Sequence, residues 1–173
     1  MKCSLAGIDL IKTMEACRLT AYQDGAGIWT IGWGQTGTDI KAGLKWTQAQ
    51  ADTALQNDLD SRVTRLRTLV TIPLGDNQFS ALVSLSYNIG VPGLGSSSAL
   101  RLANEGSFDA VPAAIMLWNK ITVNGAKQVS PGLVGRRAAE CALWALADSA
   151  GPPFPNWDAI RQAAVAQFRA GEV

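Results

Sequence analysis

Residues 15–34 of this 173-residue chain read EACRLTAYQDGAGIWTIGWG, and this stretch separates two kinds of sequence pattern. Before it, apolar residues recur at helical spacing, so a helix capped by Ser4 and ending near Glu15 is predicted. Within it, and on to Trp46, short alternating runs are separated by glycines, which is typical of small hairpin strands. We therefore expect a β region directly after the first helix.

The remainder of the chain shows helical patterns, and no other β region is predicted. Thr47 with Gln50 forms a capping box ahead of a long helix. Asp76 is expected to cap the next helix, which Gly90 would end. Further helices are predicted over residues 98–104, 107–118 and 130–147, and in the tail from residue 157, beyond a run of prolines.

These patterns predict an α+β, mainly helical fold with a small β-hairpin lobe and a helical lobe. A length of 173 residues and a hydrophobic content of 47% suit one ordinary globular unit. No internal repeat or long linker is visible. Residues 1–173 are therefore expected to form a single domain, with the β-containing lobe at about 16–60 and the helical lobe in the remainder.

The composition argues against several functions. Histidine is absent, whereas Ser-His-Asp and Cys-His hydrolysis need an imidazole base and zinc hydrolases usually need it as a ligand. Cys3, Cys17 and Cys141 are odd in number and widely spaced, so we expect reduced thiols and no disulfide framework. The formal net charge of +1 gives no global field to attract nucleic acid or an anionic membrane.

Two carboxylates in the opening stretch are candidates for acid–base chemistry. Hydrolysis of a glycosidic bond needs an acid that protonates the leaving oxygen and a second group that activates water or stabilises the positive sugar. Glu15, at the end of a helix facing an aromatic-rich lobe, suits the first role, and Asp24 suits the second. The alternative is that Glu15 merely ends a helix in solvent and Asp24 begins an Asp-Gly turn.

The same stretch closely resembles the active-site signature of the phage-type lysozymes, glycoside hydrolase family 24. In that family a Glu, an Asp nine residues on and a Thr six further form the catalytic set, and Glu15, Asp24 and Thr30 reproduce both intervals. The resemblance runs from about Ile8 to Trp144. Its downstream part consists of Gln78–Leu82, Tyr87–Gly90, Trp118, Gly132–Arg137, Glu140 and Leu143–Trp144.

This resemblance implies a lysozyme-like fold and an endolysin activity. The reaction would be hydrolysis of the β-1,4 bond between N-acetylmuramic acid and N-acetylglucosamine in peptidoglycan, leading to cell-wall lysis and phage release. Glu15 would protonate the leaving oxygen, while Asp24 and Thr30 would position the attacking water or stabilise the positive sugar. Whether Asp24 acts as base or as nucleophile stays open. No metal and no organic cofactor is implied.

Three positions near the signature carry further expectations. The family usually has glycine where Ala16 stands, so we expect that this backbone position does not need a positive φ. Gln35 stands where histidine is commonest, so it keeps hydrogen-bonding capacity without titrating. Cys17 lies two residues from Glu15, and its oxidation is a hypothetical block on the acid. Equal lytic activity with and without reductant would contradict that hypothesis.

Two other groups of residues have competing interpretations. Arg136 and Arg137 could meet peptide carboxylates of the wall, but pairing of one arginine with Glu140 or another acid is the favoured interpretation. Most of the six tryptophans are expected in the core. Trp29 and Trp33, in the hairpin beside the candidate site, are the better candidates for stacking on sugar rings.

Two other functional classes stay open. A lytic transglycosylase would act on the same substrate with a single catalytic Glu and form an anhydro product, although Asp24 and Thr30 at hydrolase spacing argue against it. A non-catalytic peptidoglycan-binding module is the non-enzyme alternative, although all signature positions are filled.

The ends of the chain bear on partners and location. No signal peptide or membrane anchor is visible in the first residues, so we expect accumulation in the host cytoplasm until lysis, with access to the wall by way of a holin. We expect a monomer that acts on peptidoglycan glycan strands. The tail carries two acidic and two basic residues, so little lysis of intact Gram-negative cells from outside is expected.

Overall fold

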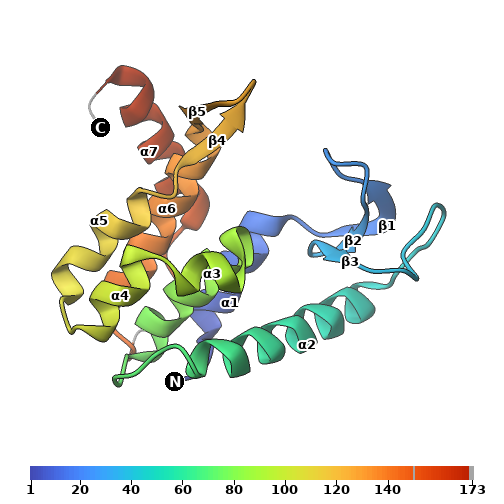
Figure 1. Ribbon diagram of the computed structural model, residues 1–173. Helices are drawn as coiled ribbons and strands as arrows, with labels where there is room; N and C mark the ends of the chain where they lie inside the picture. Colours follow the sequence, from blue (N-terminus) through green and yellow to red (C-terminus); the bar gives the residue numbers. More distant parts are fainter. Residues whose placement is uncertain (150, 172–173) are drawn as a thin grey trace.

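The computed structural model describes residues 1–149 and 151–171, which form a mainly helical α+β structure with two small antiparallel sheets (Figure 1). The predicted fold class is confirmed. The helices are α1 (Leu5–Glu15), α2 (Gln48–Arg67), α3 (Asp76–Gly95), α4 (Ser98–Asn104), α5 (Val111–Met116), α6 (Pro131–Ala145) and α7 (Trp157–Ala170), with a 3-10 helix at Phe108–Ala110. The strands are β1 (Arg18–Gln23), β2 (Trp29–Gly32), β3 (Gln35–Thr36), β4 (Lys120–Val123) and β5 (Ala126–Val129).

The first sheet, in the order β1-β2-β3, stands apart from the helices α3–α7, and α2 runs back from it into the helical part (Figure 1). Within residues 1–149 and 151–171, none of the helices is long and apolar enough to cross a membrane.

Helix α3 forms the centre of the hydrophobic core, and two glycines let neighbouring helices approach closely. Residues 79–86 of α3 are buried throughout. A methyl group on Gly7 would collide with Ser80, so glycine allows α1 to lie tightly against α3. In α6, a Cβ on Gly135 would lie 3.0 Å from the backbone oxygen of Arg161, so glycine brings α7 close to α6. The contact at Gly7 places α1, which carries Glu15 at its C-terminal end, directly against α3.

Helix α1 begins and ends where the sequence predicted. Ser4 Oγ accepts a hydrogen bond from Gly7 N at 3.0 Å, which caps the helix. The expectation for Ala16 was wrong, because this residue has φ 49° and ψ 108°. The chain must turn sharply out of the helix into β1, and this turn requires a positive φ that glycine adopts without strain.

The predicted boundaries of α3 were partly wrong, whereas the capping box of α2 is confirmed. Gly75 and not Asp76 is the N-cap of α3. The carboxylate of Asp148, far along the chain, accepts hydrogen bonds from Asp76 N and Asn77 N and so satisfies the first turn. Gly90, with φ 78°, kinks the helix without ending it, and helical structure continues to Gly95.

The second sheet was not predicted. Strands β4 and β5 pair around Asn124-Gly125, whose positive φ values of 50° and 80° are typical of a tight hairpin turn. The predicted helix over residues 107–118 is interrupted, because it consists of the 3-10 helix and α5.

The tail helix α7 packs back on the body as predicted. Trp157 is 2% exposed, and its Nε1 donates to Asp9 Oδ2 of α1 at 2.9 Å.

Candidate active site

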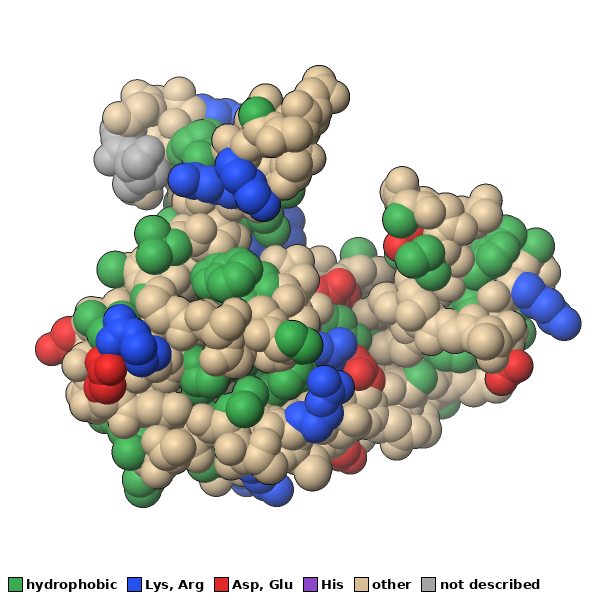
Figure 2. Space-filling model, viewed as in Figure 1, with side chains coloured by type: hydrophobic (Ala, Val, Ile, Leu, Met, Phe, Trp, Pro, Cys, Tyr) green, Lys and Arg blue, Asp and Glu red, His purple; other side chains and the backbone are tan. Residues whose placement is uncertain are grey.

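A cleft of about 350 Å³ opens at the C-terminal end of α1, where the first sheet meets the helices. Figure 2 shows acidic and basic side chains gathered in the hollow between these two parts. The cleft is lined by residues from α1, the β2–β3 turn, β3, α2 and α3, namely Glu15, Gly34, Gln35, Thr36, Asp58, Arg62 and Tyr87.

Glu15 enters the cleft with its two carboxylate oxygens in different surroundings. Oε1 lies 2.8 Å from Arg136 Nη1 of α6, in an ion pair whose side chains are 20% and 10% exposed. Oε2 lies on the side of Gly34, where a Cβ atom would come within 3.6 Å of it. Gly34 has φ 99°, so glycine both permits the turn and leaves room beside Oε2. The arrangement holds one oxygen and leaves the other beside the cleft wall.

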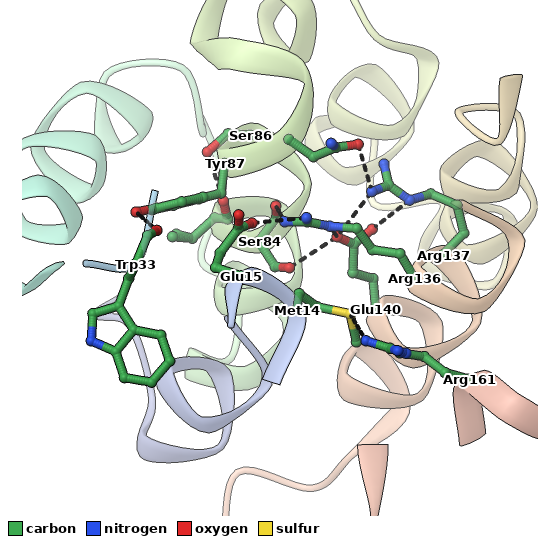
Figure 3. A network of polar contacts seen from close by, with 12 residues as sticks. Met14, Glu15, Trp33, Ser84, Ser86, Tyr87, Arg136, Arg137, Glu140 and Arg161 are labelled. Atoms are coloured by element: carbon green, nitrogen blue, oxygen red, sulfur yellow. Dashed lines mark hydrogen bonds and ion pairs between the residues drawn. The ribbon is translucent and has the colours of Figure 1, made fainter. Parts of the chain in front are cut away.

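Arg136 belongs to a buried network that ties the cleft to the core (Figure 3). Its Nε lies 3.3 Å from Glu140 Oε1, while Arg137 Nε lies 3.0 Å from Glu140 Oε2. Ser84 Oγ donates to Glu140 Oε1 at 2.9 Å. Glu140 and Arg137 are fully buried, so the favoured interpretation of this arginine pair is confirmed.

Side-chain hydrogen bonds hold the turn that carries Gly34, and Figure 3 shows the one between Tyr87 and Trp33. Gln35 Oε1 accepts from Trp33 N at 2.7 Å, and its Nε2 donates to Tyr87 Oη at 3.2 Å. Tyr87 Oη in turn donates to Trp33 O at 3.2 Å. Gln35 therefore has a structural role, and the β2–β3 turn is bound directly to α3.

Tyr87 lies under a cation. The Arg62 guanidinium lies 4.4 Å from the centre of the Tyr87 ring, and Arg62 Nε donates to Asp58 Oδ2 at 3.1 Å. Burial first, and then the negative charges of Asp58 and Glu15, raise the pKa of Tyr87 above its ordinary value. The Tyr87 hydroxyl therefore keeps its proton and stays available as a donor.

The other two predicted catalytic residues lie in the β1–β2 hairpin and do not line this cleft. Asp24 Oδ1 accepts from Ala26 N and Ile28 N, both at 2.9 Å, so Asp24 does organise the turn. Thr30 is 5% exposed, and its Oγ1 donates to Ile28 O at 3.1 Å. Of the three predicted residues, the structure puts only Glu15 in the wall of the cleft.

The Trp33 side chain contacts two charged residues, Asp52 of α2 and Lys12 of α1. Its Nε1 donates to Asp52 Oδ1 at 2.9 Å, and Lys12 Nζ donates to the same oxygen at 2.9 Å. The Lys12 ammonium also lies 5.1 Å from the Trp33 ring centre. The contact with Lys12, then that with Trp33, lowers the pKa of Asp52. Trp144 and Trp157 are buried, whereas the remaining tryptophans, among them Trp29 and Trp33, are half-buried.

Sequence reasoning missed the cleft residues Asp58 and Arg62 and the role of the Tyr87 hydroxyl. The four-residue spacing of Asp58 and Arg62 on a predicted helix was a signal of their ion pair. Cys3, Cys17 and Cys141 are free thiols, as expected. Among residues 1–149 and 151–171, no group of three or more cysteine or acidic side chains could hold a metal ion.

Known proteins of similar sequence and fold indicate the family of this chain. Residues 12–140 match the Phage lysozyme family. An endolysin of Acyrthosiphon pisum secondary endosymbiont phage 1 is 40% identical over 144 residues, which cover 83% of this chain and 98% of that protein. An endolysin of Bacillus phage PZA is 39% identical, and the match spans 55% of its length. The solved endolysin of Escherichia coli O157:H7 phage FAHEc1 is 38% identical with a TM-score of 0.80, covering 88% of this chain and 97% of the other.

The chain belongs to the phage lysozyme family. Its activity is that of an endolysin, a lysozyme-type hydrolase of peptidoglycan lysis.

Proposed function

We propose that Glu15 is the catalytic acid, which protonates the leaving oxygen of the β-1,4 bond between N-acetylmuramic acid and N-acetylglucosamine. The supporting observation is the division of its carboxylate, with Oε1 bound to Arg136 and Oε2 beside Gly34 in the cleft. General acid catalysis requires a carboxyl group held in a fixed direction at hydrogen-bonding distance from the leaving oxygen. The pinned turn and the ion pair together supply that rigidity.

Asp24 and Thr30 complete the proposal. Asp24 lies in the turn between β1 and β2, and Thr30 lies in β2, where it pairs with Tyr22 of β1. Asp24 and Thr30 therefore belong to the same hairpin. The second oxygen of Asp24 remains for an attacking water or a positive sugar, because the two turn amides bind only Oδ1. Thr30 would position that group. This assignment requires the sugar to lie between the hairpin and Glu15.

A second candidate function is that of a lytic transglycosylase, and it is suggested by which residues line the cleft. Glu15 is the only member of the predicted catalytic set that lines it. A lytic transglycosylase needs a single carboxyl group and no positioned water, and it would release an anhydro product. A non-catalytic wall-binding module would release no product.

Product analysis separates these candidates. Purified peptidoglycan is digested with wild type, Glu15→Gln, Asp24→Asn and the exposed control Glu105→Gln, and the products are identified by mass spectrometry. Hydrated muropeptides with reducing muramic-acid ends from wild type and the control, with a loss of at least roughly a hundredfold in the two site variants, support the proposal. Anhydro products would support the transglycosylase, and no product from any protein would support a binding module.

The endolysin relatives also suggest how the protein reaches its substrate. We propose that residues 1–173 act as a single catalytic domain and a monomer, held in the host cytoplasm until a holin opens the inner membrane. Expression with and without a holin tests this, since lysis is expected only with the holin. Lysis on expression without the holin would contradict the proposal.

A further inference from the structure

A second pocket, of about 410 Å³, lies on α2 outside the Glu15 cleft. The N-terminal half of α2 extends away from α3–α7 and runs up to the first sheet (Figure 1). Its exposed residues at 50, 53 and 57 recur at intervals of three and four, so they form one stripe on the side opposite the buried core positions. The pocket is lined by Trp46, Ala49, Gln50, Thr53, Ala54 and Asn57. It is therefore open to a ligand from solution and shares no lining residue with the cleft.

The first sheet holds Trp46 at one end of this pocket. Trp46 N donates to Leu19 O of β1 at 2.9 Å. The Trp46 ring packs against Gly32 of β2, where a Cβ atom would lie 3.0 Å from it. The side chain of Gln35, which lines the Glu15 cleft, contacts the same glycine. Trp46 therefore offers a fixed, half-buried ring close to the cleft wall.

The polar groups of the pocket are free to bind a ligand. Those without a hydrogen-bond partner in the part of the chain that the structure describes are Trp46 Nε1, Gln50 Nε2, Thr53 Oγ1 and the side-chain amide of Asn57. Gln50 uses only its Oε1, which accepts from Thr47 N in the capping box. The free groups include both donors and acceptors, and none of the lining side chains is charged.

The charged residues of the same helix segment are engaged elsewhere. Asp52 Oδ1 accepts from Lys12 Nζ and Trp33 Nε1. Asp58 Oδ2 accepts from Arg62 Nε on the side of the cleft. These carboxylates are therefore paired away from the pocket, which presents a neutral surface.

We propose that this pocket binds N-acetylglucosamine units of the glycan strand, away from the bond that is cut. The inference rests on the endolysin activity of the chain and not on the role of Glu15. Such sugars carry hydroxyl and amide groups that match the free groups of the pocket, and their C–H faces pack on an aromatic ring such as that of Trp46. The carboxylate of a muramic acid unit meets no cation in the lining, so the pocket favours the neutral units.

The pocket and the cleft lie on adjoining faces of α2. Asn57 lines the pocket and the next residue, Asp58, lines the cleft, so their side chains are about 100° apart around the helix axis. From Gln50 to Asn57 the pocket extends roughly 10 Å along the helix. A strand bound there raises the effective concentration of its other bonds at the cleft. This gain exists only for substrates that reach both sites.

A titration tests the binding directly. The uncharged tetramer of N-acetylglucosamine is added to the isotope-labelled protein, and the indole N–H signals of the tryptophans are followed by NMR. The signal that is missing in Trp46→Phe belongs to Trp46. A saturable shift of this signal is expected, because its N–H is free to donate to the sugar. Absence of a shift at millimolar tetramer overturns the proposal, even if the signal of Trp33 beside the cleft shifts.

The variant Thr53→Ala/Asn57→Ala removes two of the free polar groups, and alanine preserves the helix. The dissociation constant from the Trp46 signal should rise at least roughly fivefold, since each neutral hydrogen bond contributes a factor of about 2 to 10. The matched control Gln56→Ala/Thr64→Ala removes one amide and one hydroxyl from exposed positions of α2 outside the pocket. The control should stay within about twofold of wild type. Equal changes in the two variants, or no change in the pocket variant, overturn the proposal.

Activity on two substrates shows what the pocket contributes. On insoluble peptidoglycan, Thr53→Ala/Asn57→Ala should lose roughly fivefold in rate at low substrate concentration, whereas the control should not. On soluble fragments of about two disaccharides, which are too short to reach both sites, the pocket variant should stay within about twofold of wild type. Equal losses on both substrates overturn the proposal. A wild type that releases no product would contradict the proposed function, while the titration would still decide whether the pocket binds the sugar.

Discussion

Arg136 bridges the cleft and the core, because its Nη1 lies 2.8 Å from Glu15 Oε1 and its Nε lies 3.3 Å from Oε1 of the buried Glu140. The Arg136 side chain is only 10% exposed, so its orientation is set mainly by protein groups. The direction of the Glu15 carboxylate therefore depends on Arg136, which is itself held by a buried carboxylate.

Replacement of Glu140 by glutamine is expected to destabilise the protein strongly. The change removes the only carboxylate within 4.0 Å of the fully buried Arg137 among the described residues. Breaking a buried ion pair by removal of one partner typically costs about 3–5 kcal/mol, because the other charge is left uncompensated. Urea denaturation of Glu140→Gln against wild type measures the loss in free energy of unfolding.

The matched control is Glu105→Gln. Glu105 pairs with Arg101 at the four-residue spacing that Arg136 and Glu140 also have, but both of its side chains are about half exposed. Exposed pairs of this kind contribute about 0.3–0.5 kcal/mol. Similar losses in the two variants would show that burial of the Glu140 network has no special weight.

Tyr87→Phe is expected to loosen the cleft without unfolding the protein. The variant keeps the ring under Arg62 but loses the hydroxyl that donates to Trp33 O and accepts from Gln35. A lost hydrogen bond costs about 1 kcal/mol of stability. Displacement of the turn beside Glu15 should lower kcat/KM roughly tenfold, mainly through kcat. Full activity in Tyr87→Phe would show that the turn holds its position without Tyr87.

Local signals predicted much of the fold. Ser4, Thr47 and Gln50 satisfy helix ends within a few residues of themselves, and their caps are present as predicted. The N-terminus of α3 could not be predicted in this way, because Asp148 reaches it from 72 residues away. The β4–β5 hairpin had a local signal in Asn124-Gly125, but its strands lack the clear alternation of a half-buried sheet since nearly all their residues are exposed.

Of the candidate site, too, only a part could be predicted from local sequence. Glu15 was identified from its place at a helix end and from the family signature. Its partners come from α2, α3 and α6, at sequence distances that no periodicity connects. The ion pair between Glu15 and Arg136 is a tertiary contact across 121 residues, so it follows from how α1 and α6 pack and not from either segment alone.

Ala16→Gly is expected to stabilise the protein. Ala16 has φ 49°, a conformation that costs a non-glycine residue about 1–3 kcal/mol, whereas glycine costs about 0.5–1 kcal/mol in unfolded-state entropy. A net gain of about 1 kcal/mol would raise Tm by about 2–4 °C. The control Ala49→Gly, at an exposed site in the first turn of α2, should lose stability, by at most about 1 kcal/mol. A lower Tm in Ala16→Gly would show that the turn tolerates alanine without strain.

Asp52→Asn is expected to remove part of the acid sensitivity of the protein. The contacts of Asp52 with Lys12 and Trp33 lower its pKa in the folded state. A carboxylate with a lowered folded-state pKa contributes stability that is present above its unfolded value of about 3.9 and is lost as pH falls through the folded value. The Tm of wild type should therefore exceed that of Asp52→Asn at pH 7 and pH 5, and the difference should shrink below about pH 4.

Salt and a second variant separate the Lys12 contact from net charge. Asparagine can still accept the Trp33 indole hydrogen, so the variant mainly loses the attraction to Lys12. Asp52 is 40% exposed, so added salt should reduce the Tm difference at pH 7 by screening. Asp39→Asn makes the same charge change at an exposed position. A Tm difference that grows on acidification, or an identical pH response in Asp39→Asn, would mean that the ion pair does not link α1 to α2 beneath Trp33.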